Sequence, residues 1–440
     1  MKRPTGTFSP TACTGPPAPA ETPAVPGSLR RNVSWTLVGN TVYAGCQWGM
    51  LVVLAKFGTV GMVGQFALAM AVTAPVFMLT NLNLRAVQTT DARFDYRFGE
   101  YFALRLATTG LALLSIGAIA VSGAYRSETV LVILAVALAK MVEAISDVLY
   151  GSFQRHERLD LIARSMMIKG PLSLAALAVS VRLTESVLWG SVALAASWAA
   201  VLAAYDLPNG ARTLRSNGGD RLRPTWDVQR LVALGLIALP LGVVMMLLSL
   251  NINVPRYFIE HDLGEGPLGI FAATASLMIA GGVVVNALGQ SASARLSRYR
   301  VTGDTQAYRS LMLRLYGMSA LLGAAGVIVA LAAGEQVLEL FYGPEYAVHS
   351  SLLVWLMASS ALSYIFSIQG TSLTALRCFR IQAVLHAASA AFALPLFFYF
   401  IRSHGLAGAA YALLIQGAVM VLAYGWSEAR ARALADSRPR

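Results

Sequence analysis

The stretch of sequence that decides the fold is residues 249–290, SLNINVPRYFIEHDLGEGPLGIFAATASLMIAGGVVVNALGQ. Two apolar spans meet in it across a short polar bend. The first span ends in residues that are unusual in a membrane helix, namely Asn251, Asn253, Pro255 and Arg256. The bend holds Glu260, His261, Asp262 and Glu265. The second span contains Gly281-Gly282 and closes with Asn286 and Gln290. The stretch predicts two membrane helices with polar groups at membrane depth.

An earlier stretch repeats this pattern 205 residues upstream. Five residues of the later copy, Gly266, Gly269, Phe271, Ala272 and Asn286, match Gly61, Gly64, Phe66, Ala67 and Asn81. Gly281 falls on Val76, beside Pro75, so both copies carry a helix-weakening residue at nearly the same depth. Spans interrupted by Gly or Pro at matching positions of two halves indicate the substrate site of a transporter.

The composition is that of a polytopic membrane protein. Hydrophobic residues make up 56% of the 440 and charged residues only 13%, whereas soluble domains have about 25% charged residues. The three cysteines form neither a disulfide framework nor a metal-ligand spacing, so no cofactor or metal is expected. A net charge of +12 would suggest nucleic acid in a soluble protein, but here its distribution indicates a membrane.

Twelve apolar spans are each about long enough to cross a bilayer. They lie near 34–55, 62–84, 100–122, 128–150, 165–182, 186–206, 231–252, 266–289, 310–333, 349–371, 380–401 and 405–426. Unpaired backbone groups are not tolerated in lipid, so the spans must be helices. The fold class predicted is therefore an all-α polytopic membrane protein. Residues 1–28 contain seven of the seventeen prolines and no apolar run, which predicts a disordered cytoplasmic tail.

Lys and Arg residues orient the chain. With the N-terminus on the cytoplasmic side, 27 of the 34 lie in cytoplasmic segments, Lys169 among them. Five lie in outer segments, namely Lys56, Arg126, Arg182, Arg256 and Arg402. This asymmetry is the positive-inside pattern, and it predicts a multi-pass protein of the bacterial inner membrane with both termini cytoplasmic. The basic residues are expected to face anionic lipid rather than nucleic acid.

A basic stretch with turn residues, 207–230, divides the spans into six and six. We predict an N-terminal bundle over 29–206, a cytoplasmic linker over 207–230, a C-terminal bundle over 231–428 and a basic tail over 429–440. Both halves enter from the cytoplasm, so the two bundles should be parallel repeats around a central cavity.

Four polar residues share one face of the fourth span: Lys140, Glu143, Asp147 and Tyr150. In one interpretation Lys140 contacts an anionic substrate in a cavity, while Glu143 and Asp147 tune it or bind a coupling cation. In the other, Lys140 and Glu143 form a neutral structural pair and Asp147 lies at the headgroup level. The spacing is compatible with both.

Two arginines lie near opposite ends of the expected path. Arg256 follows Pro255 at the outer end of the seventh span and either meets a phosphate there or extends to the interface. Arg85 lies at the inner end of the second span, beyond Asn81, where it could receive a phosphate from the cytoplasm.

The remaining polar residues form stripes or stand alone. Arg105 and Arg377 are expected to extend to the lipid headgroups, although a role in binding stays open for both. Stripes at helical spacing predict cavity lining or interhelical hydrogen bonds. They are formed by Asn40, Tyr43 and Gln47 in the first span and by Asn286 and Gln290 in the eighth.

Catalytic signatures are weak. The sequence has no Gly-Lys-Ser/Thr phosphate loop, and the outer segments, the longest near 253–265 and 334–348, are short for a membrane glycan polymerase or ligase. The acidic cluster of the 249–290 bend is the one catalytic alternative, and we expect a solvated loop there. A transporter is favoured over an enzyme.

Several segments resemble bacterial polysaccharide-biosynthesis membrane proteins, the Wzx-type flippases of lipid-linked oligosaccharides in the multidrug/oligosaccharidyl-lipid/polysaccharide superfamily. They are VGQFALAMAVTAP at 63–75, NLRAVQTTDA at 83–92, AKMVEAISDVLYG at 139–151, NVPRYFI at 253–259 and YGPEYA at 342–347. Their order along a twelve-span chain is more specific than any single motif.

The resemblance implies two six-helix bundles around a V-shaped cavity. It also implies transfer of an undecaprenyl-diphosphate-linked sugar unit to the outer leaflet, next to polysaccharide polymerase or other assembly proteins. Fixed cations would lower the cost of moving a diphosphate across hydrocarbon. The main alternative is an exporter of small cationic compounds from the same superfamily, which Lys140 and Arg256 disfavour.

Overall fold

The structure is a computed structural model that describes residues 29–91, 95–123, 125–216, 221–376 and 378–436. The predicted tail over 1–28 lies outside the described residues. The helices are α1 (Leu29–Phe57), α2 (Val60–Thr80), α3 (Leu84–Thr90), α4 (Phe98–Ser122), α5 (Ser127–Arg155), α6 (Leu159–Thr184), α7 (Val187–Val201), the π-helical segment η1 (Leu202–Asp206), α8 (Leu207–Ser216), α9 (Val228–Leu263), α10 (Glu265–Thr302), α11 (Thr305–Phe341), α12 (Pro344–Ala347), α13 (Ser350–Ala375) and α14 (Phe379–Asp436).

The helices confirm the predicted fold class. Within the described residues, eleven helical segments are long and apolar enough to cross a membrane. The last of them, Ile381–Ala431, has 51 residues, about 76 Å if straight, which is more than twice the hydrocarbon thickness of about 30 Å. At Gly405 φ is 59° and the helical path breaks, so this segment supplies two crossings and brings the total to twelve.

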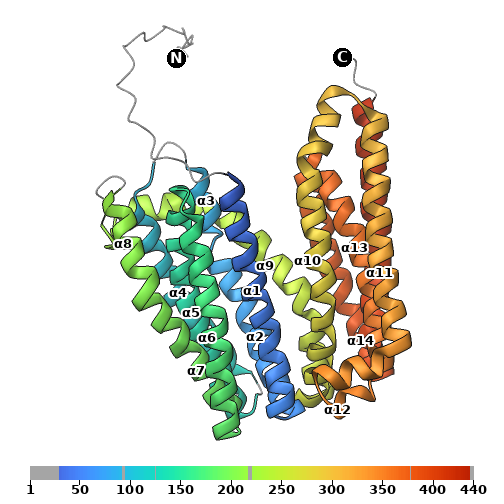
Figure 1. Cartoon of the computed structure of the whole chain (residues 1–440), viewed down its shortest axis with the longest axis horizontal. Coiled ribbons are helices and arrows are strands. Elements are labelled where there is room, and N and C mark those ends of the chain that lie inside the picture. The colour runs from blue at the N-terminus through green and yellow to red at the C-terminus, as the bar shows by residue number, and fades with distance from the viewer. Residues whose placement is uncertain (1–28, 92–94, 124, 217–220, 377, 437–440) are drawn as a thin grey trace, which may run out of the picture.

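The crossings form two bundles (Figure 1). In the N-terminal bundle α1 packs on α6, and α5 contacts α2, α4 and α7. In the C-terminal bundle α13 packs between α11 and α14 and also contacts α10. The bundles diverge toward the end of the molecule where α1 begins and α14 ends, and they meet at the opposite end, which we call the closed end (Figure 1).

Helix α9 belongs to both bundles, although the sequence assigns it to the second. Its first half packs in the N-terminal bundle, where Leu234 and Ala238 share an apolar cluster with Leu82 and Tyr101. In its second half Asn251 accepts a hydrogen bond from Gln416 of α14 at 2.8 Å. Because it contacts α2 and α14 about equally, α9 bridges the two bundles diagonally.

The closed end is sealed by direct backbone contact between α2 and α10. A Cβ at Gly64 would lie 1.8 Å from the Glu265 carbonyl oxygen, and a Cβ at Gly269 would lie 2.1 Å from the Val60 carbonyl oxygen. The repeat maps Gly64 onto Gly269 and Val60 onto Glu265. The contact therefore occurs twice with the roles of the helices exchanged, as a pseudo-two-fold axis requires. We call it the glycine seal.

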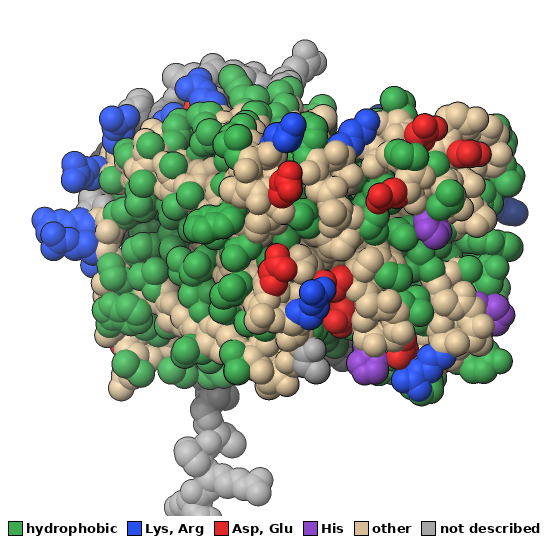
Figure 2. Space-filling model, turned by 90° about the horizontal axis from the view of Figure 1, so that it is seen from below, with side chains coloured by type: hydrophobic (Ala, Val, Ile, Leu, Met, Phe, Trp, Pro, Cys, Tyr) green, Lys and Arg blue, Asp and Glu red, His purple; other side chains and the backbone are tan. Residues whose placement is uncertain are grey.

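Polar contacts reinforce the glycine seal. Thr129 of α5 donates a hydrogen bond to the Glu265 carboxylate and accepts one from Gln65 at 3.3 Å. Tyr342 accepts a hydrogen bond from the Trp48 indole at 3.0 Å. Burial raises the pKa of Tyr342, so its hydroxyl stays protonated. Seen from the closed end, the side chains of both bundles form one surface (Figure 2).

The predicted extent of the polar bend is wrong, because the turn between the two spans consists of one residue. Helix α9 continues to Leu263, and Gly264, with φ of 92°, is the only residue between α9 and α10. A positive φ favours glycine because it has no Cβ. The acidic cluster is therefore not a solvated loop. Asp262 accepts a hydrogen bond from Arg402 at 3.2 Å, and Glu265 lies in the sealed contact.

Other local expectations are also corrected. Helices α2 and α10 run without interruption through Pro75 and Gly281. Gly281 instead allows close packing, because a Cβ there would lie 2.1 Å from the Tyr364 hydroxyl of α13. The first ten residues of the predicted linker, 207–216, form α8, and α9 already starts at Val228.

Candidate functional site

Lys140 and Glu143 form an ion pair on α5. The Lys140 ammonium lies 2.8 Å from the Glu143 carboxylate, and Tyr43 of α1 donates a hydrogen bond to the same carboxylate at 3.0 Å. Their side chains remain 20% and 35% exposed. Both interpretations of Lys140 therefore keep a structural basis: the charge is neutralised, and it remains accessible.

Asp147 holds two arginines in the part of the N-terminal bundle that lies away from the closed end. Arg105 of α4 lies 3.0 Å from it and Arg85 of α3 lies 3.7 Å away. Arg105 is fully buried and also donates a hydrogen bond to Asn81, so the expectation that it extends to the headgroups is wrong. Arg85 is 30% exposed and donates a further hydrogen bond to Gln154 at 2.9 Å. Arg85 is thus the accessible cation of this cluster.

A second buried pair was missed by the sequence reasoning. Lys169 of α6 and Asp206 at the end of η1 lie 3.6 Å apart, with 2% and 0% of their side chains exposed. Lys169 also donates hydrogen bonds to Ser146 and Tyr150. Lys169 was counted among the cytoplasmic cations although it lies within the predicted fifth span, 165–182, and in the structure it lies ten residues after the start of α6 at Leu159. The Asp206 carboxylate inside an apolar run was the available signal.

The polar residues of α9 form two sets of hydrogen bonds, one within α9 and one with α14. Arg256 donates a hydrogen bond to the Asn253 amide oxygen at 3.0 Å, and Asn253 donates to the Ser249 carbonyl at 2.8 Å. Asn251 turns to α14, where it pairs with Gln416 and Ser389. Arg256 is half-buried near the closed end and has no acidic partner among the described residues.

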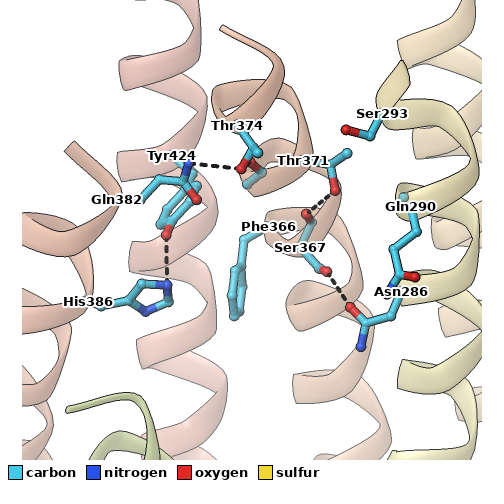
Figure 3. A pocket seen from close by; sticks show the side chains of 12 residues that line it. Asn286, Gln290, Ser293, Phe366, Ser367, Thr371, Thr374, Gln382, His386 and Tyr424 are labelled. Carbon is cyan, nitrogen blue, oxygen red and sulfur yellow. Dashed lines mark hydrogen bonds between the residues drawn. The ribbon is translucent and has the colours of Figure 1, made fainter. Parts of the chain in front are cut away.

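The C-terminal bundle contains a pocket of about 410 Å³ between α10, α13 and α14 (Figure 3). Its polar groups are neutral side chains, including Asn286, Gln290, Thr371, Gln382, His386 and Tyr424. The Tyr424 hydroxyl and His386 Nε2 are 3.0 Å apart, and Gln382 donates to Thr374 at 3.1 Å. Asn286 accepts a hydrogen bond from Ser367 at 3.4 Å. Asn286 and Gln290, predicted as one stripe, thus line one cavity.

The first-span stripe is less uniform. Tyr43 joins the Lys140 pair, Asn40 is exposed, and Gln47 is half-buried. The Gln47 amide nitrogen is buried without a hydrogen-bond partner among the described residues. Arg377, the remaining predicted site residue, lies outside the described residues.

The arrangement separates two kinds of chemistry. The N-terminal bundle presents cations paired with carboxylates, which suit a phosphate as a replacement partner. The C-terminal pocket presents amides, hydroxyls and aromatic rings, which suit an uncharged polar ligand. Among the described residues, no group of three or more His, Cys, Asp or Glu is placed to hold a metal ion.

Comparison with known proteins places this geometry in context. No family model matches the chain. The chain is 26% identical over 401 residues to the capsular polysaccharide biosynthesis protein CapF of Staphylococcus aureus, covering 90% of this chain and 98% of that one. The predicted resemblance to polysaccharide-biosynthesis membrane proteins is thereby confirmed.

Solved structures share the fold. An inward-facing multidrug resistance MATE family transporter of the MOP superfamily aligns with a TM-score of 0.66 at 12% identity, covering 92% of this chain and all of the other. The lipid II flippase MurJ in an inward closed conformation aligns with a TM-score of 0.69 at 12% identity, covering 89% and 87%. The fold is therefore that of MOP superfamily transporters.

Proposed function

We propose that this protein is a flippase that moves a polyprenyl-diphosphate-linked oligosaccharide from the inner to the outer leaflet of the bacterial inner membrane by alternating access. The relative with a role in capsular polysaccharide biosynthesis supports a glycan pathway. The shared fold supports transport by two bundles that rock against each other. The end where the bundles diverge is then the cytoplasmic side, and polysaccharide assembly proteins would take the product from the outer side.

The observation that carries the proposal is a series of cations at three depths, of which Arg85 and Lys140 are partly exposed and Arg256 is half-buried. From the rise of 1.5 Å per residue, Arg256 lies about 10 Å from the closed end of α9, and Lys140 lies about 20 Å from the closed end of α5. Asp147, which holds Arg85, lies about 30 Å from that end of α5. A diphosphate crossing the membrane would therefore meet a cation near the inner mouth, near mid-membrane and near the outer seal.

Partner exchange explains how two of these cations, Arg85 and Lys140, can bind without being stranded in lipid. Arg85 and Lys140 now have carboxylate partners, and each side chain is partly exposed. An arriving diphosphate can replace Asp147 at Arg85 and Glu143 at Lys140. Glu143 would then be free to take up a coupling cation, which would tie ion entry to substrate binding, whereas Asp147 would stay paired with Arg105. A cationic cargo would instead be repelled, which disfavours the drug-exporter alternative.

Deletion of the gene in its own bacterium, followed by complementation, tests the proposal. We expect loss of surface polysaccharide and accumulation of lipid-linked precursor on the inner side, both reversed by the wild-type gene. Lys140→Ala and Arg256→Ala should complement poorly because the path loses a cation. Lys56→Ala and Arg182→Ala are matched controls, since both side chains are exposed, and they should complement fully.

The rival functions give different results. A drug exporter would leave polysaccharide unchanged and make the deletion strain sensitive to cationic dyes. A polymerase would leave single repeat units on the outer leaflet rather than on the inner one. Either pattern would overturn the proposal. Full complementation by both cation variants would retain the flippase but remove the proposed path.

A further inference from the structure

The pocket between α10, α13 and α14 has a chemistry that the cation path does not use. Of the twelve described residues that line it, none is Lys, Arg, Asp or Glu. Phe366 and Tyr424 are 5.9 Å apart at their ring centres and contribute aromatic surface. The remaining groups can both donate and accept hydrogen bonds, which matches the hydroxyls of a sugar.

We propose that this pocket binds the sugar rings of the substrate, while the N-terminal bundle binds the diphosphate. The inference rests on the proposed flippase function and adds a second, separate subsite to it. A volume of about 410 Å³ lies within the range of small-molecule sites and suits a mono- or disaccharide. Sugar hydroxyls would bond to Asn286, Gln290 and Gln382, and the apolar face of a ring would lie on Tyr424 or Phe366.

The internal repeat supports this division. A shift of 205 residues maps Asn81 onto Asn286 and Arg85 onto Gln290. The same register thus carries a cation in one bundle and a shorter, neutral amide in the other. The local structure diverges as well, since α2 ends at Thr80 while α10 continues past Gln290. The half with Arg85 suits phosphate and the half with Gln290 suits sugar.

The position of the pocket fits the point of entry. Asn286 lies 21 residues after the start of α10 at Glu265, about 32 Å along the helix. This depth equals the hydrocarbon thickness of about 30 Å, so the pocket opens at the inner mouth, where polar sugars are still in contact with water. Asn286 and Gln290 are both exposed there. Among its described lining residues, a phosphate would find no cation and a cationic drug would find no carboxylate.

Binding of two lipids to the purified full-length protein tests the division. The probes are undecaprenyl diphosphate and undecaprenyl diphosphate carrying the repeat-unit saccharide of the source bacterium. We expect Arg85→Gln to weaken both lipids by a similar factor. Gln290→Ala should leave the Kd of the sugar-free lipid within twofold and weaken the sugar-bearing lipid about tenfold, through loss of hydrogen bonds to the glycan. Ser291→Ala is the matched control, because this neighbouring residue is exposed and lies outside the pocket lining.

The outcomes separate the inference from the function on which it rests. Binding of neither lipid by the wild-type protein would overturn both. Binding of both lipids with no selective effect of Gln290→Ala would overturn the sugar subsite and leave the flippase. An equal loss for both lipids in Gln290→Ala would also refute the division, since the amide would then act on the diphosphate.

Discussion

The glycine seal gives the sharpest test of the conformational cycle. In Gly64→Ala, the new Cβ would lie 1.8 Å from the Glu265 carbonyl oxygen, whereas real Cβ contacts are not closer than 3.0 Å. The backbones of α2 and α10 must therefore separate by about 1.2 Å or more at this point. The Cβ position is fixed by the α2 backbone and the atom that it meets is a backbone oxygen of α10, so no side-chain rotation can relieve the contact.

The separation destabilises only the state in which the closed end is sealed. Overpacking of this kind costs about 1–3 kcal/mol, which corresponds to a shift of about 5- to 150-fold in the ratio of the two states. We expect a shift toward the outward-open state. Gly61→Ala is a matched control three residues away, because its Cβ would meet only Thr59 at 3.8 Å.

Electron–electron distance measurements can follow the shift. Spin labels at Glu128→Cys and Glu345→Cys, both exposed at the closed end, should report longer distances in Gly64→Ala than in the parent. Labels at Arg215→Cys and Thr302→Cys, at the opposite end, should report shorter distances. A cysteine-free background is required. Unchanged distributions in Gly64→Ala, or an equal change in Gly61→Ala, would refute the role of the seal.

Three further predictions concern the buried network. Asp206→Ala leaves the buried Lys169 ammonium without its carboxylate partner and should lower the free energy of unfolding by about 3–5 kcal/mol. Denaturant titration in detergent measures this loss. A Lys169→Met/Asp206→Leu double variant that is equally unstable would contradict the pairing argument. Arg105→Gln should reduce the yield of folded protein in size-exclusion chromatography, because that side chain is fully buried. Arg85→Gln should keep the yield but lose precursor transport in the complementation assay. The opposite result would mean that Arg105 serves transport and Arg85 serves folding. Tyr342→Phe removes the hydrogen bonds to Trp48 and Ser276 and should destabilise the sealed state by about 1 kcal/mol. The distances between the closed-end labels should then lengthen, as in Gly64→Ala. Shorter distances would contradict this prediction.

The sequence predicts the architecture because membrane helices are specified locally. Apolar length and the Lys and Arg asymmetry are enough to find the twelve crossings, and the repeat of Gly61 and Gly64 onto Gly266 and Gly269 correctly marked an important pair of helices. Its purpose was read wrongly. The repeat was taken to mark a substrate site because Gly281 and Pro75 weaken the two helices at nearly the same depth, whereas its matched glycines Gly64 and Gly269 permit backbone contact at the seal.

The site is only partly predictable, since the partners of a charge come from distant helices. Lys140 and Glu143 are three residues apart and their pairing follows from helical spacing. Arg105 and Asp147 lie on different helices, so nothing local distinguishes a buried arginine from one that extends to the headgroups. Gln382 and Tyr424 were not predicted at all, because polar residues of this kind occur singly in the apolar spans and gain meaning only where α10, α13 and α14 converge.

The exchanged roles of Gly64 and Gly269 make the seal equivalent to an isologous dimer interface within one chain. Such a contact would allow a single bundle to close against a second copy of itself. With both copies in one chain, the glycine seal stays symmetric while the lining of each bundle can change alone. Arg85 and Gln290 occupy matching positions of the repeat and differ in this way, so the molecule combines a symmetric seal with the two different subsites proposed above.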